Sequence, residues 1–117
     1  MLCVLVPLLM SFFSAGYTAS PSDNICGMTS VDKLFNPAMV DFALVMSETP
    51  EVKEMKRENI SRKTPKGKIL FSQAMQRITK ECVDIMRGYS YCSVWKKIKH
   101  PTKKIDNITK QILARLE

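Results

Sequence analysis

The chain is poor in the side chains that carry catalysis. His100 is the only histidine among 117 residues, and it stands between Lys99 and Pro101 with no cysteine within three residues. A zinc site therefore has no ligands at a recognised spacing, and a Cys-His nucleophilic pair has no carboxylate to orient the histidine. Acidic residues are spread along the chain and form no converging pair. We expect no enzyme, no metal site and no cofactor.

Charge is missing from residues 1–20. An apolar block opens the chain and leads to small residues: Leu2-Cys3-Val4-Leu5-Val6-Pro7-Leu8-Leu9-Met10, then Phe12-Phe13, then Ser14-Ala15-Gly16. This order is typical of a secretory signal peptide, whereas a membrane span needs about 20 apolar residues without the interruptions at Pro7 and Ser11. Cleavage is expected near residues 16–20, after Gly16 or near Ala19 and Ser20. The protein is predicted to be secreted and extracellular, without a membrane span.

The mature chain, residues 21–117, has the length of one small domain. All 18 basic and 11 acidic residues lie in it, so it carries the whole net charge of +7. A chain of about 100 residues buries on the order of 65% of its unfolded surface around a single core. Such a basic secreted domain favours anionic partners such as glycans or lipids, although solvated helix faces account for the same charge. Nucleic acid is not an expected partner after export.

Cysteine is scarce, and its number is odd. The sequence has four cysteines; Cys3 leaves with the signal, so Cys26, Cys82 and Cys92 remain. In an oxidising compartment an odd number predicts an interchain disulfide, with or without one internal bridge, and hence a homo- or heterodimer. The pairing stays open between Cys26–Cys82 and Cys82–Cys92, and the shorter bridge needs the chain to turn back at Gly88.

Two glycosylation sequons follow the signal, Asn59-Ile60-Ser61 and Asn107-Ile108-Thr109. In an exported chain both are acceptors for N-linked glycans. Asn59 is the favoured site, because its polar and basic neighbours are typical of a loop.

No segment of the mature chain alternates apolar and polar residues as a half-buried strand does. Apolar residues instead recur at helical spacing, and Asn36-Pro37 and Thr49-Pro50 are typical helix starts. We predict helices over residues 37–47, from Thr49 onward, from about 69 to a cap at Gly88, and over 103–116. A polar loop is expected over 57–68 and an irregular link over 89–100. The expected fold is an all-α, four-helix secreted domain with the 69–88 helix at its centre.

Methionine and phenylalanine supply much of the apolar stripes. These adaptable side chains serve either as ordinary core packing or as the wall of a ligand cavity or dimer interface. We predict that a small hydrophobic ligand, steroid- or lipid-like, is enclosed by Phe35, Phe42, Met46, Phe71 and Met75. The densest run of lysines, residues 96–104, is called the basic cluster below; we expect this ligand not to need it.

Three short segments follow one another in a distinctive order: Cys26, then Leu44-Val45-Met46-Ser47-Glu48-Thr49-Pro50-Glu51, then Lys80-Glu81-Cys82-Val83-Asp84-Ile85-Met86. In this order they resemble the secretoglobin (uteroglobin-like) family. The resemblance implies a disulfide-linked dimer of four-helix subunits that shelters a small hydrophobic ligand. The chain departs from the family pattern in its additional Cys92 and in having no cysteine near the C-terminus.

A second class of protein fits the same signal, sequons and amphipathic helices. This alternative is a secreted, cytokine-like signalling protein that acts through a receptor or anionic glycans. The two hypotheses differ in the part played by the basic cluster. Binding of an apolar probe that is insensitive to salt favours the first, and salt-dependent binding of a polyanion favours the second.

Overall fold

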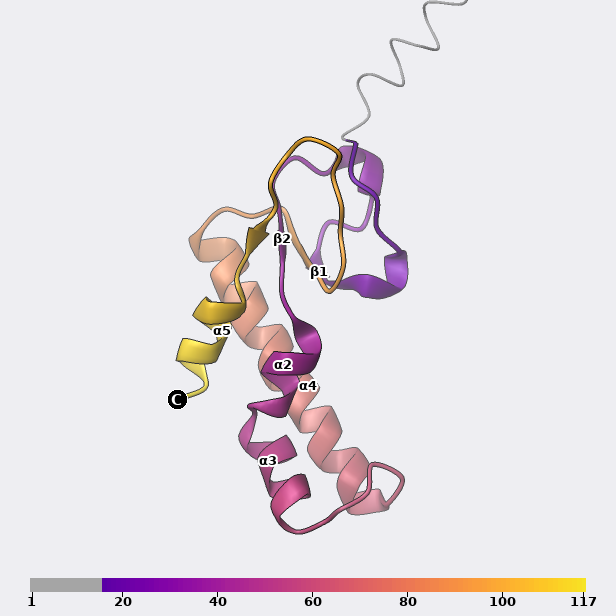
Figure 1. The fold of residues 1–117 in the computed structure, drawn as a ribbon, viewed down its shortest axis with the longest axis vertical. Coiled ribbons are helices and arrows are strands. Elements are labelled where there is room, and N and C mark those ends of the chain that lie inside the picture. Colours follow the sequence, from indigo (N-terminus) through magenta and orange to yellow (C-terminus); the bar gives the residue numbers. More distant parts are fainter. Residues whose placement is uncertain (1–15) are drawn as a thin grey trace, which may run out of the picture.

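The computed structural model describes residues 16–117; residues 1–15, most of the predicted signal peptide, lie outside the described part. Four helices occur in this part: α2 (Phe42–Ser47), α3 (Pro50–Arg57), α4 (Pro65–Gly88) and α5 (Thr109–Arg115). Four short strands accompany them: β1 (Asn24–Gly27), β2 (Pro37–Met39), β3 (Ser93–Trp95) and β4 (Asp106–Asn107). Single 3-10 turns, η1 (Pro21–Asp23) and η2 (Val31–Lys33), flank β1. Figure 1 shows an elongated molecule in which α4 runs from the sheet at one end to α3 at the other.

The strands form one mixed sheet in the order β1-β3-β2-β4. β3 is antiparallel to β1 and parallel to β2, and β4 is parallel to β2. The all-α prediction is therefore wrong, and so is the four-helix fold implied by the secretoglobin resemblance. The strands are two to four residues long, and all three residues of β3 are buried. A strand covered on both faces has no alternating pattern to detect.

The helix predicted over residues 37–47 begins late. Pro37–Met39 pairs with β3 and β4 instead, and α2 starts only at Phe42, where the Asp41 side chain accepts a hydrogen bond from the Leu44 amide at 3.2 Å. Asn36, the expected N-cap, donates its side-chain amide to the Ser90 carbonyl at 3.0 Å. The Asn36 side chain therefore binds the turn after α4 and does not cap a helix.

Each of the two Thr-Pro pairs starts a helix, with the threonine as the N-cap. Thr49 caps α3 by accepting from the Val52 amide at 3.2 Å, so the predicted start is confirmed. Thr64 caps α4 in the same way, through the Gly67 amide at 3.0 Å. Because of this second cap, α4 begins at Pro65, inside the segment predicted to be a loop.

The predictions for residues 89–116 are wrong where the chain joins the sheet. The link over residues 89–100 contains β3, the strand that pairs with both β1 and β2. The final helix is shorter than the predicted 103–116, because residues 106–107 pair with β2 before α5 begins at Thr109.

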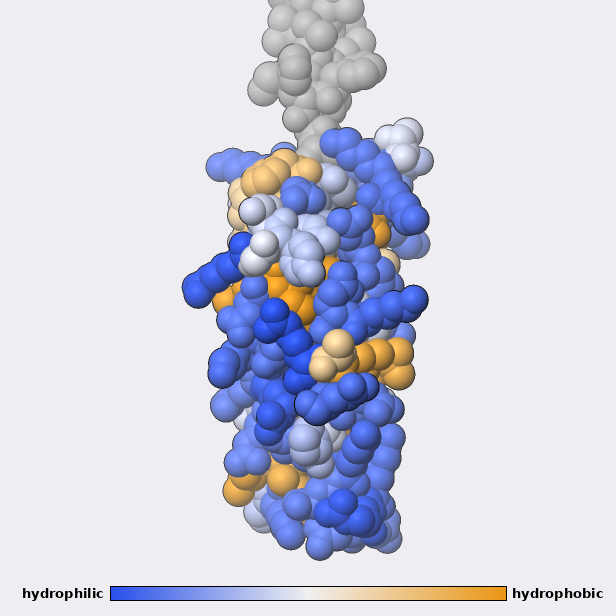
Figure 2. Space-filling model, turned by 90° about the vertical axis from the view of Figure 1, so that its left-hand side faces the viewer, coloured by the Kyte–Doolittle hydropathy of each residue, from blue (hydrophilic) through white to orange (hydrophobic). Residues whose placement is uncertain are grey.

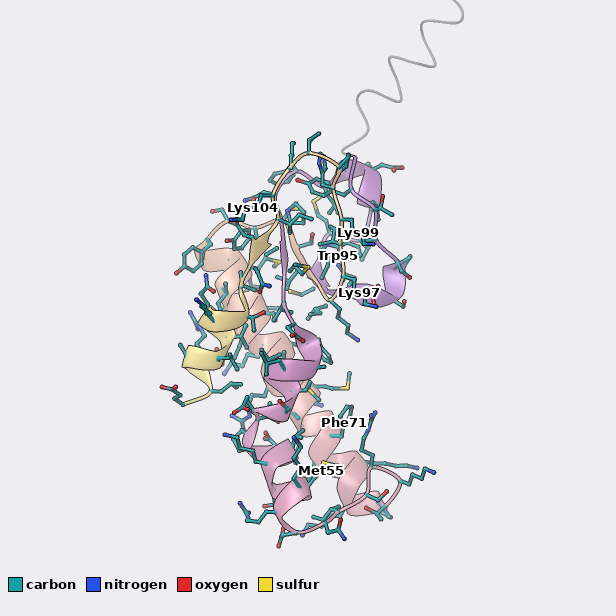
Figure 3. All side chains as sticks on the ribbon, in the orientation of Figure 1. Met55, Phe71, Trp95, Lys97, Lys99 and Lys104 are labelled. Atoms are coloured by element: carbon teal, nitrogen blue, oxygen red, sulfur yellow. The ribbon has the colours of Figure 1, made fainter. Side chains whose placement is uncertain are left out.

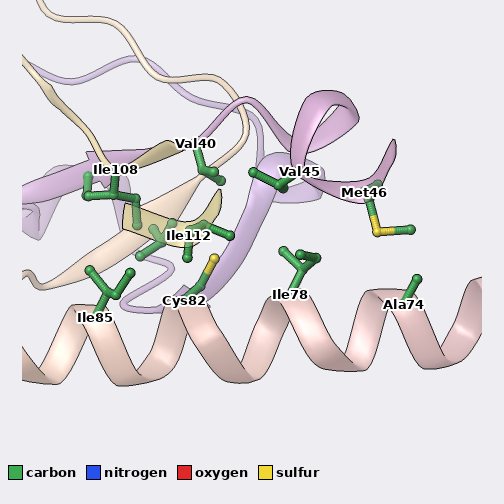
Figure 4. Packing of buried hydrophobic residues seen from close by; sticks show 11 residues of the cluster. Val40, Val45, Met46, Ala74, Ile78, Cys82, Ile85, Ile108 and Ile112 are labelled. Carbon is green, nitrogen blue, oxygen red and sulfur yellow. The ribbon is translucent and has the colours of Figure 1, made fainter. Parts of the chain in front are cut away.

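The main core confirms the central position of α4. Its inward-facing residues Ala74, Ile78, Cys82 and Ile85 are at most 1% exposed. They meet residues from α2, from α5 and from the segments around the sheet, as Figure 4 shows: Val40, Val45, Met46, Ile108 and Ile112. A bidentate ion pair joins the first turn of α3 to the middle of α4, with Arg77 Nη2 2.7 Å from Glu51 Oε2. Hydrogen bonding from Arg77 keeps the pKa of the Glu51 carboxyl below its ordinary value.

A second, smaller core lies at the sheet end. Trp95 is fully buried there with Leu34 and Ile98, and its indole Nε1 donates to the Ser93 hydroxyl at 2.6 Å. The only tryptophan of the chain is therefore a structural residue, although in sequence it adjoins the basic cluster.

Residues that precede the predicted domain start are packed on this second core. Thr18 and Lys99 exchange two backbone hydrogen bonds of 2.9 and 3.0 Å. Tyr17 lies edge-on to His100 with 4.7 Å between ring centres, and it also contacts the cluster around Trp95. Cleavage after Gly16 would keep these contacts, whereas cleavage near residues 19–20 would remove them.

We accordingly expect the secreted protein to begin at Tyr17, which N-terminal sequencing of exported material would show. A chain made to begin at Pro21 should melt at a lower temperature, by roughly 4–8 °C for each kcal/mol lost in a domain of this size. A natural N-terminus at Ser20 or Pro21, together with equal melting temperatures for the two chains, would contradict this.

Candidate functional site

A groove of about 740 Å³ lies beside α2. Its apolar wall comes from β2, from α2, from the first turn of α3 and from the N-terminal half of α4: Met39, Val40, Phe42, Ala43, Met46, Val52 and Phe71. Its polar residues come from η1, from α2, from loops and from β4: Asp23, Asp41, Ser47, Arg62, Lys96, Lys97 and Asn107. We refer to this feature as the α2 groove.

Three of the five predicted ligand-binding residues meet in the α2 groove. Phe42, Met46 and Phe71 line it. Phe35 lies elsewhere, just after η2, with 66% of its surface exposed. Met75 is 40% exposed and lines a separate shallow hollow with neighbours from α4 only. It follows the buried Ala74 by one residue, which turns it about 100° around the helix away from the core.

Sequence reasoning missed the remaining residues of the α2 groove. Met39 belongs to a strand that was not expected, and Arg62 belongs to a loop between two helices. Lys96 and Lys97 belong to the basic cluster, which the ligand was expected not to need. No local pattern marks these residues, because only the folded chain brings their segments to one place.

Two cations of the α2 groove rest on aromatic rings. The guanidinium carbon of Arg62 lies 3.7 Å from the centre of the Phe71 ring, and Lys96 Nζ lies 4.4 Å from the centre of the Phe42 ring. In the view of Figure 3, Lys97 lies on the sheet side of α2 and Phe71 on the α3 side. The groove thus has a lysine end and an arginine end.

The basic cluster is spread along the connection between β3 and β4. Figure 3 shows Lys97, Lys99 and Lys104 at separate places on this connection. Of the cluster, Lys96 and Lys97 line the α2 groove, while Lys103 Nζ lies 6.0 Å from the Tyr17 ring centre. The lysines do not form one compact patch beside the groove.

The cysteines are present as free thiols at Cys26, Cys82 and Cys92. Burial raises the pKa of Cys82 to about 12 and that of Cys26 to about 11, so both thiols are neutral and poorly nucleophilic near pH 7. Cys26 lies 3.9 Å from the Met86 sulfur. Because Cys82 is 0% exposed, an interchain bridge of the folded protein has to use Cys26 or Cys92. The disulfides and the dimer stay predictions.

The two sequons differ in their surroundings. Asn59 is exposed, with φ at 54°, in the turn after α3. Asn107 uses its side-chain oxygen to accept hydrogen bonds from the amide and hydroxyl of Thr109, and it lines the α2 groove. A glycan at Asn107 would compete with a ligand, so Asn59 stays the favoured site.

The described residues offer little else that could be a site. Between residues 16 and 117 no three His, Cys, Asp or Glu side chains are grouped as metal ligands. His100 accepts hydrogen bonds at Nδ1 from the amides of Thr102 and Lys103, at 3.1 and 2.8 Å. No helix in this part of the chain is both long and apolar enough to span a membrane.

Comparison with protein-family models, with curated proteins and with solved structures finds no match to this chain. The α2 groove is therefore the main basis for a functional proposal.

Proposed function

We propose that the α2 groove binds a small hydrophobic molecule in a secreted, extracellular protein. Pockets for small ligands typically hold about 300–1,000 Å³ and are mostly apolar with a few polar groups. The α2 groove, at about 740 Å³, has seven apolar residues among the fourteen that line it. The single observation that carries the proposal is that apolar side chains of four different elements face this one hollow.

The apolar wall is partly open to solvent. Phe42, Val52 and Phe71 are only half-buried, although they pack against the main core. A ligand that covered them would remove apolar surface from water, which stabilises the complex by roughly 25 cal/mol per Å² before the costs of binding. Met46 supports the floor of the groove, and a thioether side chain adjusts readily to the shape of a ligand.

Apolar surface outside the α2 groove is scattered. The large exposed apolar residues occupy several separate segments: Phe35, Leu44, Ile69, Met75 and Tyr89. The face shown in Figure 2 is mainly hydrophilic, with apolar side chains in small separate areas. Single exposed apolar side chains are normal on protein surfaces, so the groove is the better candidate for apolar recognition.

We expect the protein that begins at Tyr17 to bind N-phenyl-1-naphthylamine, a neutral probe that becomes fluorescent in apolar sites. Phe42→Ala should weaken this binding about tenfold, because it removes the aromatic side chain that α2 contributes to the groove. Phe35→Ala is the matched control, since Phe35 is exposed and lies outside the groove. Titration of probe fluorescence measures both effects.

Two results would contradict the proposal. One is the absence of saturable probe binding, and the other is an equal loss of binding in the two variants. If, in addition, the protein binds heparin and loses it when Lys96, Lys97 and Lys99 are replaced by Gln, the signalling hypothesis becomes the better one.

A further inference from the structure

On the basis of the proposed function, we infer that the ligand is an amphipathic anion of the fatty-acid kind, and that Arg62 binds its anionic end. The juxtaposition that carries this inference is a guanidinium stacked on an aromatic wall residue at one end of an apolar groove. Arg62 and Phe71 both line the α2 groove.

The stacking of Arg62 on Phe71 places its hydrogen-bond donors. With the guanidinium carbon 3.7 Å from the ring centre, one face of the planar group is covered by the ring. Its N–H donors lie in the plane of the group and point outward, in a fork that matches a carboxylate. The contact therefore orients the group without using its donors.

Arg62 has no carboxylate partner among residues 16–117. The four ion pairs among residues 16–117 are formed by other cations, namely Lys53, Lys66, Arg77 and Arg115. Lys63, its neighbour in the loop before α4, adds positive charge, whereas Lys66 in the first turn of α4 is paired with Glu58. An anionic end group would supply the missing partner, and charge-assisted bidentate pairs are among the stronger hydrogen-bonded contacts.

The lysine end of the α2 groove is less suited to an anion. Lys96 and Lys97 share the groove lining with Asp23 and Asp41. A backbone hydrogen bond of 2.7 Å from the Lys96 amide to the Asp23 carbonyl keeps these two residues together, and Asp41 directly precedes Phe42, on whose ring Lys96 rests. Formal charges at this end therefore cancel. An alkyl chain that runs from Arg62 past Val52 and Met46 toward Phe42 would bring only its uncharged tail near Lys96, which rests on the Phe42 ring.

The test compares decanoate with 1-decanol, two probes of equal chain length that differ in the charge of the end group. By isothermal titration calorimetry at pH 7.5 we expect the wild-type protein to bind decanoate roughly tenfold more tightly than decanol. The preference should fall as salt is added, because screening weakens a partly exposed ion pair.

Variants locate the end group. R62Q should weaken decanoate binding about tenfold and decanol binding much less, which abolishes the preference. R62K should restore only part of it, because an ammonium lacks the planar fork. K97Q removes a cation from the other end of the groove and should weaken the preference far less than R62Q. K63Q is the matched control, because Lys63 is the cation next to Arg62 in the sequence and does not line the groove, so this variant should keep the full preference.

The possible failures are distinguishable. If neither probe binds, the proposed function and this inference both fail. If wild type binds decanol and decanoate equally, or if R62Q keeps the preference, the inference is overturned and the apolar groove stands. If K97Q rather than R62Q abolishes the preference, the anion lies at the lysine end and the assignment to Arg62 is wrong.

Discussion

Replacing Ile78 with aspartate is expected to unfold the protein. Ile78 is 0% exposed and lies in the middle of the inward face of α4, where the main core offers no cation to pair with a new carboxylate. An unpaired buried charge costs several kcal/mol, which is a large share of the roughly 5–15 kcal/mol that stabilises a typical domain. Far-UV circular dichroism and thermal melting would show loss of helical signal and of a cooperative transition.

Met75→Asp is the matched control for this prediction. It places the same side chain on the same helix, three residues earlier, at a position that is 40% exposed. Its carboxylate stays in water, so the melting temperature should change little. Equal effects of the two substitutions, or a folded Ile78→Asp protein, would mean that α4 does not organise the core.

Replacing Trp95 with alanine is expected to cost about 3–5 kcal/mol, the range for removing a large aromatic side chain from a core. Trp95 is the largest fully buried side chain. Its loss also leaves the buried Ser93 hydroxyl without the indole donor that lies 2.6 Å away. Urea unfolding followed by circular dichroism should show a clear fall in the midpoint.

Phe35→Ala is the comparison for Trp95→Ala. It also deletes an aromatic ring near the sheet end, but from a side chain that is 66% exposed. The free energy of unfolding should therefore fall by less than about 1 kcal/mol. If Trp95→Ala were as mild as Phe35→Ala, the second core would contribute little to stability. The same conclusion, that the second core contributes little to stability, would follow if Trp95→Ala changed the m-value slightly and left the urea midpoint unchanged.

The helices that could be predicted are those with local start signals. Thr49-Pro50 marks α3, because a threonine hydroxyl and a proline at the first helical position satisfy the helix end without help from elsewhere. Thr64-Pro65 carries the same signal for α4. Here the polar residues around it were interpreted as a loop, so the length of α4 was underestimated.

The sheet could not be predicted, because its stability comes from pairing between distant segments. Ala38 pairs with Val94 on one side and with Asp106 on the other. Neither partner is visible from the neighbours of Ala38 in the chain, and Pro37 in front of it favours a helix start as much as a strand start. Tertiary pairing decided between two locally acceptable conformations.

In the candidate site, too, residues on helices could be predicted from the sequence and residues on loops could not. Helical periodicity placed Phe42, Met46 and Phe71 on inward stripes, and the structure brings these three residues together. Phe35 was assigned to such a stripe although it lies outside any helix. The polar rim, including Arg62 and Lys96, depends on how loops pass the groove, and no periodicity encodes that.

The order of the strands in the sheet has a consequence for how the chain folds. β1 and β2 lie near the start of the mature chain, yet both pair with β3, which is made more than 50 residues later. The hairpin of α3 and α4 involves near neighbours in sequence and can form while the chain is still emerging. Closing the sheet requires long loops to be ordered, which slows folding. In the part of the chain from residue 16 onward, β1 and β2 therefore stay without their common partner strand until the last quarter of the chain has been made.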